Sequence, residues 1–178
     1  EVLDNAFDQS IIKDDPATLI CVEMDSTSFK VSNNGKSIPV VKMNGTEDMV
    51  PHVVFGKLRS GSKFDGGDTI GTFGLGVKLC NVFSSKFEIT CNDKERALKF
   101  DGIWSKNMKK VEKNKVSKCS KKPRFSTIVS CQPELSRFQG VDDLMVLKEH
   151  ILTKLVVMSH THDNKKLKIM FNGERVPS

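Results

Sequence analysis

The stretch GTFGLGVKLCNVFS at residues 71–84 decides how this sequence is interpreted. Gly71, Gly74 and Gly76 run into an apolar segment that predicts a helix over residues 73–83. Glycines let a backbone come close to a ligand, and a helix that begins there directs free N–H groups toward phosphate. The segment is not a P-loop, because Lys78 does not directly follow a glycine. It is not a dinucleotide fingerprint either, because the glycine spacing differs. Taken alone, the cluster also fits a flexible helix start.

A second polar pattern lies at residues 1–13, which are predicted to form a helix. Glu1 and Asn5 are one helical turn apart, and Asp8 continues the same stripe. A carboxamide oxygen is a suitable ligand for Mg²⁺, and a carboxylate beside it can orient or deprotonate a water that attacks a γ-phosphate. By spacing alone, the stripe equally fits a polar helix face without a role.

A third pattern is the sequence VSNNGKSIP at residues 31–39. Asn33 stands at the end of a predicted strand, where its amide could pair with the edge of a purine. The alternative is a plain hairpin turn, because Asn-Asn-Gly is a common turn signal.

The remaining pattern predicts one α+β domain over residues 1–178, a two-layer sandwich with helices on one face of a mixed, mostly antiparallel sheet. Residues 59–72 are predicted to be a loop. Strands are expected at 18–23, 28–32, 87–91, 97–103, 125–131 and 167–171, and further helices at 47–58 and 142–158.

Composition excludes several classes of protein. No apolar run is long enough to span a membrane, and the five cysteines form no CxxC pair, so buried reduced thiols are expected. The net charge of +6 is concentrated in residues 109–124, where lysines face a single acid, Glu112. This segment is predicted to be a solvated loop, and a contact to a phosphate backbone is the alternative.

The three patterns together, in this order, resemble the GHKL (Bergerat) ATP-binding superfamily, which combines a Glu-x-x-x-Asn helix, an adenine-binding loop and a glycine-rich lid. Residues 50–58 (VPHVVFGKL), 74–84 (GLGVKLCNVFS), 104–108 (WSKNM), 130–138 (SCQPELSRF) and 171–177 (FNGERVP) resemble the eukaryotic DNA topoisomerase II family in particular. The resemblance runs from Glu1 to Pro177.

This resemblance implies a role for each matching residue. Glu1 would be the general base, Asn5 the Mg²⁺ ligand, and Asn33 the residue that meets adenine. The other positions that would contact the nucleotide are Asp8, Gln9, Ile38, Ser60, Ser62, Gly71, Thr72, Phe73, Gly74, Leu75, Gly76, Val77, Lys78 and Thr127.

The sequence departs from the family at two places. Ser37 stands where the family has a glycine, which would be unfavourable if φ were positive there. Thr72 and Phe73 replace an Arg and an Asn of the family lid, and Lys63 could restore part of the lost positive charge. These changes bear on nucleotide affinity and lid order.

The resemblance implies an ATP- and Mg²⁺-dependent DNA topoisomerase of type IIA in the nucleus, in which ATP closes a homodimeric clamp around double-stranded DNA. This chain would be its ATPase part, without the upstream arm and the downstream transducer domain, and mostly monomeric by itself. The alternative is a divergent GHKL module, a switch like MORC proteins or Hsp90, that binds nucleotide with little turnover.

Overall fold

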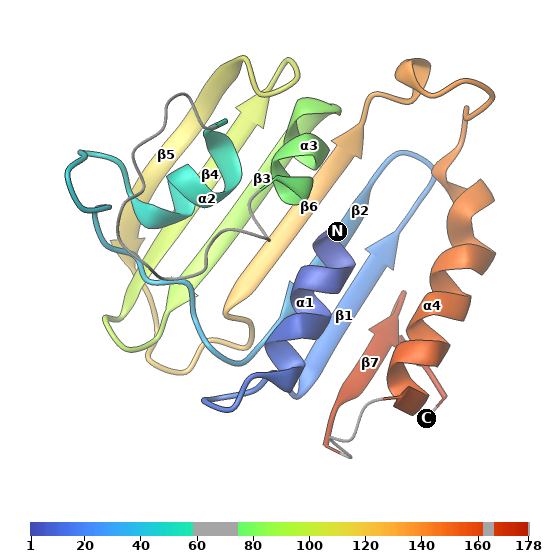
Figure 1. The fold of residues 1–178 in the computed structure, drawn as a ribbon, viewed down its shortest axis with the longest axis horizontal. Helices are drawn as coiled ribbons and strands as arrows, with labels where there is room; N and C mark the ends of the chain where they lie inside the picture. Colours follow the sequence, from blue (N-terminus) through green and yellow to red (C-terminus); the bar gives the residue numbers. More distant parts are fainter. Residues whose placement is uncertain (59–74, 162–165, 178) are drawn as a thin grey trace.

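The computed structural model describes residues 1–58, 75–161 and 166–177 of the chain. Within them, one sheet has the strand order β5-β4-β3-β6-β2-β1-β7-β8 (Figure 1). Its strands are β1 (Leu19–Met24), β2 (Phe29–Asn33), β3 (Ser84–Asp93), β4 (Leu98–Ser105), β5 (Lys110–Lys118), β6 (Thr127–Pro133), β7 (Lys168–Phe171) and β8 (Glu174–Arg175). The helices are α1 (Val2–Ile11), α2 (Val50–Gly56), α3 (Gly76–Val82) and α4 (Lys148–Thr161), with two 3-10 turns at Leu135–Arg137 and Leu144–Leu147.

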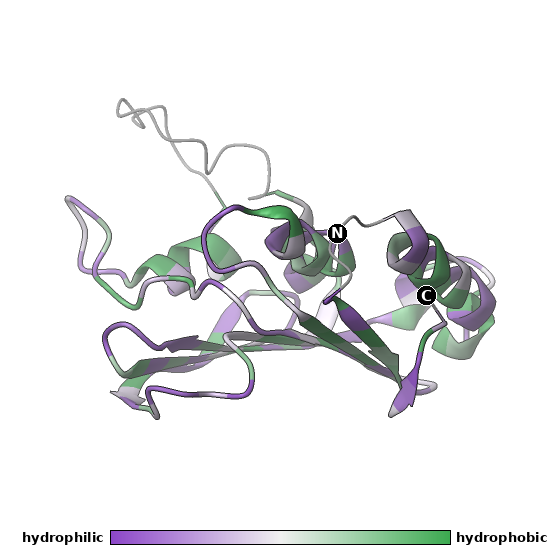
Figure 2. Cartoon of the chain, turned by 90° about the horizontal axis from the view of Figure 1, so that it is seen from below, coloured by the Kyte–Doolittle hydropathy of each residue, from purple (hydrophilic) through white to green (hydrophobic). Residues whose placement is uncertain are grey.

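The helices cover one face of the sheet and leave the other face to solvent (Figure 2). All strand pairs are antiparallel except β1 with β7, which run parallel. The predicted α+β sandwich with a mixed, mostly antiparallel sheet is therefore confirmed. No helix in the described residues is both long and apolar enough to cross a membrane.

Helix α1 lies over the middle of the sheet because its apolar residues recur at helical spacing. Val2, Leu3 and Ala6 are buried against the core, and Ser10 continues the buried face. The helix ends at Ile11, because Ile12 is already extended, with a φ of −68° and a ψ of 150°. The opposite stripe, with Asn5 and Asp8, stays partly open to solvent.

The core beneath α2 and α3 is aromatic. Trp104 and Phe87 are fully buried, with ring centroids 6.0 Å apart, and His52 stacks on Trp104 at 5.5 Å. Gly56 ends α2 directly on the indole: a Cβ at this position would lie 2.2 Å from the Trp104 ring. The absence of a side chain at residue 56 therefore sets how closely α2 approaches β4.

The lysine-rich segment 109–124 is not the loop that the sequence predicts. Residues 110–118 form β5, which pairs with β4 over its whole length and ends the sheet. An edge strand exposed on both sides shows no alternation of apolar and polar residues, so the usual strand pattern is missing, and lysine is common on such strands. Backbone hydrogen bonds to β4, which the sequence does not display, hold it in place.

The predicted element bounds also need corrections. β3 is longer than the predicted 87–91, because the strand continues at both ends along β4 and β6. The helix predicted at 142–158 starts only at Lys148, because Asp143 caps a 3-10 turn by accepting a hydrogen bond from the Met145 N–H at 2.7 Å. The helices predicted at 1–13, 47–58 and 73–83 are α1, α2 and α3 with shorter described bounds.

Candidate functional site

The start of α1 meets the start of α3. A Cβ built on Gly76 would lie 1.9 Å from Oε2 of Glu1, so the Glu1 carboxylate occupies the space that any larger residue would fill. The glycine cluster and the acidic helix are 75 residues apart in sequence. The fold brings the predicted general base to the glycine that opens α3.

Asn5, Asp8 and Gln9 lie along α1 and are partly exposed. Among the described residues, the Asn5 carboxamide has no hydrogen-bond partner, so its oxygen is open to a ligand. Burial, followed by the negative charge of Asp4, raises the pKa of the Asp8 carboxyl. Burial also acts on Asp4, but a hydrogen bond and the charge of Lys154 outweigh it and lower the pKa of Asp4. The Lys154 Nζ lies 2.7 Å from Asp4 Oδ1, which ties α1 to α4.

Asn33 and Thr127 are direct partners in the pairing of β2 with β6. Thr127 also pairs with the buried Cys91 on β3, so the three residues form a row across the sheet. Asn33 shares its face with Val31, which packs in the core beneath the helices. Its Nδ2 donates a hydrogen bond to the Asn34 carbonyl at 3.0 Å. The structure thus brings Asn33 and Thr127 together, as the predicted adenine site requires.

The segment after β2 turns sharply at Gly35, which has a φ of +95°. A Cβ at this position would lie 2.6 Å from the Ala17 nitrogen, so a side chain is excluded on steric grounds as well. Ser37 is not among the residues with positive φ, so the penalty considered for this replacement does not arise. Ile38 packs against the core cluster.

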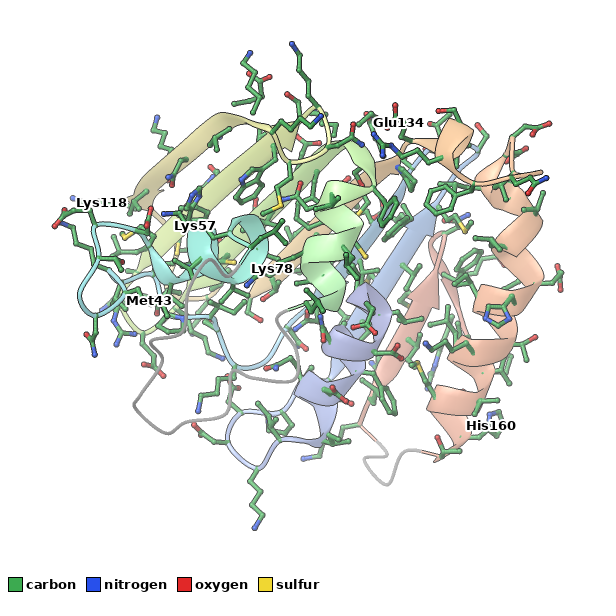
Figure 3. The ribbon with its side chains drawn as sticks, turned by 45° about the horizontal axis from the view of Figure 1, so that its top comes forward. Met43, Lys57, Lys78, Lys118, Glu134 and His160 are labelled. Carbon is green, nitrogen blue, oxygen red and sulfur yellow. The ribbon has the colours of Figure 1, made fainter. Side chains whose placement is uncertain are left out.

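Several predicted nucleotide contacts, namely Ser60, Ser62, Gly71, Thr72, Phe73 and Gly74, lie outside the described residues, as does Lys63. Leu75 is largely exposed, whereas Val77 and Lys78 are buried in α3. Lys78 is only 6% exposed. In Figure 3 it lies on the α2 side of α3.

Two residues that sequence reasoning missed organise this region. Asn81, fully buried in α3, donates a hydrogen bond from Nδ2 to the Phe55 carbonyl in α2 at 3.1 Å. Asp93, 1% exposed at the end of β3, accepts a hydrogen bond from the Val40 N–H at 2.8 Å. Asn81 lies within the 74–84 segment but receives no role from it, and Asp93 belongs to none of the quoted motifs; their partners are 26 and 53 residues away. The only sequence signal for them is a polar residue at a position that the pattern of a helix or strand predicts to be buried.

A pocket of about 330 Å³ opens beside Glu1, on the side away from Asn33. Its walls are mostly apolar and come from α3, β2, β6 and the turn that follows β6. The lining residues are Glu1, Phe29, Gly76, Leu79, Cys80, Phe83, Ser84, Cys131, Pro133 and Phe138. It shares only Glu1 and Gly76 with the predicted nucleotide contacts.

Positive charge gathers at the opposite edge of the molecule. Lys113 and Lys99 both pair with Asp101, at 3.1 and 3.0 Å, on the open face of the sheet. Lys115 and Lys118 have no ion-pair partner among the described residues, and Lys118 projects from the outer edge of the sheet in Figure 3. Lys110, Lys113, Lys115 and Lys118 form an array on strand β5, so their spacing is fixed.

Two curated eukaryotic proteins are similar to the chain over nearly its whole length. The chain is 34% identical over 184 residues to mouse DNA topoisomerase 2-beta and 31% identical over 185 residues to DNA topoisomerase 2 of Bombyx mori. Each match covers 99% of this chain and 11% of the relative. No family model matches the sequence.

Solved structures that resemble the chain come from the same kind of protein. The ATPase region of Saccharomyces cerevisiae topoisomerase II bound to ICRF-187 superposes with a TM-score of 0.82 at 27% identity, covering 99% of this chain and 47% of that one. The ATPase and transducer domains of DNA topoisomerase II from Balamuthia mandrillaris give a TM-score of 0.82 at 29% identity, covering 99% and 46%. The chain thus spans about a tenth of its curated relatives and about half of these solved regions.

Proposed function

We propose that this chain, a homologue of the ATPase regions of eukaryotic DNA topoisomerase II, binds ATP with Mg²⁺ and hydrolyses it. The observation that carries the proposal is the contact of the Glu1 carboxylate with Gly76. It joins the only two described parts of the chain that the sequence links to phosphate chemistry. The similarity over 99% of the chain supports it.

The residues along α1 fit a magnesium–phosphate group. The Asn5 carboxamide is a neutral oxygen donor without a protein partner among the described residues, one helical turn from Glu1. Bound Mg²⁺ would neutralise charge on the phosphate oxygens. Glu1 would orient the attacking water and accept its proton, which a carboxylate does best when it is held close to the reacting phosphate. Asp8 and Gln9 would contact the nucleotide further along the same helix.

The base would lie between Asn33, Thr127 and Ile38. Asn33 and Thr127 are paired across β2 and β6, and the segment that carries Ile38 leaves β2 at Gly35. The lid would be supplied by Ser60, Ser62 and residues 71–74, followed by Leu75, Gly76, Val77 and Lys78, which precede and open α3.

In the full-length protein, ATP binding would dimerise two such domains and close a clamp around double-stranded DNA in the nucleus, and hydrolysis would reset the clamp. The chain would then be the nucleotide-binding part of a type IIA topoisomerase, in one domain over residues 1–178. The names of the relatives support a topoisomerase activity for the longer protein, and this chain matches 11% of the length of such a relative.

The second candidate is a switch that binds ATP without appreciable turnover. It is favoured by the loss of the lid Arg and Asn at Thr72 and Phe73. Burst and steady-state phosphate release distinguish the two candidates, because a switch releases no phosphate after the first turnover.

The test of the proposal is Glu1→Gln in the full-length protein. Gln keeps the size and the hydrogen-bonding reach but cannot accept a proton, so ATP should bind as in the parent while hydrolysis falls by roughly two orders of magnitude or more. Bound nucleotide should then prolong the closed dimer. Glu47→Gln, at an exposed carboxylate paired with Lys42, is the control. A Glu1→Gln protein with full ATPase activity would falsify the general-base role.

A further inference from the structure

We propose that Asp93 is a positioning residue for the base-binding end of the nucleotide site. Its carboxylate holds the segment after β2, which carries Ile38, against the turn between β3 and β4. The proposal rests on the proposed ATP binding. It concerns a residue that lies outside every motif in the sequence.

Asp93 is a buried carboxylate with a complete set of partners. Oδ2 accepts hydrogen bonds from the Val40 N–H at 2.8 Å and from Nη1 of Arg96 at 3.1 Å, and Oδ1 accepts one from the Arg96 N–H at 3.1 Å. Burial opposes ionisation of the carboxyl, but these donors outweigh it and lower the pKa of Asp93. A charged group is kept buried only where such donors stabilise it.

The segment that Asp93 holds has little regular structure of its own. Residues 34–41 belong to no helix or strand. Besides the bond to Val40, the Lys94 N–H lies 3.4 Å from the Ser37 hydroxyl oxygen, a long hydrogen bond. The Lys94 ammonium also pairs with the Asp15 carboxylate, and the Asp15 carbonyl accepts a hydrogen bond from the Lys36 N–H at 2.8 Å. The β3–β4 turn thus contacts this segment on both sides of Ile38.

The residue before Asp93 holds the opposite wall of the predicted base site. Asn92 donates from Nδ2 to the Phe125 carbonyl and from its N–H to the Ser126 carbonyl, both at 2.8 Å. Ser126 in turn donates its N–H to the Asn33 carbonyl at 2.9 Å and precedes Thr127. From the end of β3, Asn92 and Asp93 therefore fix both the strand with Thr127 and the segment with Ile38.

Such a clamp preorganises the site. When the segment is already ordered, ATP binding does not have to supply the free energy of ordering it. Asp93 acts through the Val40 backbone and not through the phosphates. Its loss should weaken binding of the base and leave the chemistry at Glu1 and Asn5 unchanged.

The experiment compares Asp93→Asn with Arg96→Met and Asp101→Asn in the full-length protein. Asn is uncharged and has an NH2 donor in place of one carboxylate oxygen, so it cannot accept from both the Val40 N–H and the Arg96 N–H. KM for ATP should therefore rise about tenfold while kcat stays within about twofold, as for loss of one hydrogen bond to a charged group. Arg96→Met removes the guanidinium but keeps the Val40 bond. Asp101→Asn removes a similarly buried carboxylate on the open face. Both controls should leave KM unchanged.

A comparison of ATP and ADP with tripolyphosphate, which lacks the base, separates positioning from general loss of structure. In Asp93→Asn the affinities for ATP and ADP should fall by the same factor, whereas that for inorganic tripolyphosphate should stay as in the parent. Equal ATP affinity in a folded Asp93→Asn protein overturns the proposal, as does a parallel loss of tripolyphosphate binding. If Asp93→Asn does not fold, Asp93→Glu is the second variant: it keeps the charge but moves the carboxylate by one methylene away from its place at the Val40 N–H. An unchanged ATP affinity in Asp93→Glu then overturns the proposal.

Hydrogen exchange at the Val40 amide tests the Asp93–Val40 bond directly, without any nucleotide present. The Val40 amide should exchange at least tenfold faster in nucleotide-free Asp93→Asn than in the parent or Arg96→Met. A parent that binds no ATP but shows this difference refutes the proposed function and not the clamp. A Val40 amide that exchanges equally in all three proteins refutes the clamp itself.

Discussion

At the scale of single residues, two glycines show how a missing side chain sets geometry. Gly76 leaves room for the Glu1 carboxylate, and Gly56 leaves room for the Trp104 indole. The consequences of filling these spaces differ. Glu1 is flexible and can move away from a methyl group at residue 76, whereas the Trp104 ring is fully buried and cannot.

Gly56→Ala is therefore expected to destabilise the protein. The new Cβ would meet the fixed indole, and such overpacking costs about 1–3 kcal/mol, more than the few tenths to ~1 kcal/mol that Ala gains over Gly in a helix. Urea unfolding measures the difference. A midpoint equal to or above that of the parent would show that α2 shifts freely and that Gly56 does not set its position.

Asn5→Ala is expected to abolish the Mg²⁺ dependence of ATP binding. Asn5 offers the neutral oxygen next to Glu1 on the exposed stripe of α1, and Ala removes it without disturbing the buried face. Calorimetry with and without Mg²⁺ is the measurement, and Asn44→Ala, in the exposed loop before α2, is the control. The metal role is wrong if Asn5→Ala and the parent bind Mg²⁺–ATP with equal affinity.

At the scale of elements, β5 is where the sequence pattern misled. Its lysines protect the open edge of the sheet against pairing with other chains. This role alone accounts for a lysine-rich edge strand, whether or not the strand binds nucleic acid. The same fixed array can also contact a phosphate backbone, and no aromatic residue in β5 offers base stacking. Salt dependence decides between these alternatives.

If β5 and the residues after it contact DNA, replacing Lys113, Lys115, Lys118, Lys121 and Lys122 by Gln should flatten the salt dependence of DNA binding. Each lost phosphate contact lowers the slope of log K against log salt by about 0.9. The control replaces Lys13, Lys42, Lys57, Lys148 and Lys168, which gives the same change in net charge elsewhere. Equal slopes in parent and variant would show that these lysines do not contact DNA, and the only remaining role of the β5 lysines would be to protect the edge of the sheet.

At the scale of the whole molecule, contacts between distant segments hold one domain together. The parallel pairing of β1 with β7 joins the first strand to residues 168–171, and Lys154 pairs with Asp4 across 150 positions. Buried or half-buried carboxylates take part in several such contacts. Acid should therefore affect the stability of the entire fold.

Asp101 allows this acid dependence to be measured. Burial acts against its ionisation, but hydrogen bonds from Lys99, Lys113 and Thr90 outweigh burial and lower its pKa below the ordinary value of 3.8. A lowered folded-state pKa stabilises the protein above the unfolded-state pKa, and this contribution disappears as the pH falls through the folded value. Between pH 5 and pH 2, the free energy of unfolding of Asp101→Asn should therefore fall less steeply than that of the parent. Parallel curves would contradict the contribution of Asp101.

The sequence by itself determined the fold class and most element positions. Apolar periodicity is a local property, so α1, β1, β2 and β6 are close to their predicted bounds. The family resemblance, carried by short motifs, also pointed to the relatives that the comparisons find. The roles assigned to Glu1, Asn5 and Asn33 remain predictions.

The tertiary structure alone decided what depends on distant partners. β5 exists because β4 offers a backbone to pair with, and its own side chains carry no signal for that pairing. The contact of Glu1 with Gly76 and the bond from the Val40 N–H to Asp93 join residues 75 and 53 positions apart. A buried polar atom must find a partner wherever the folded chain provides one, and local sequence does not encode where that is.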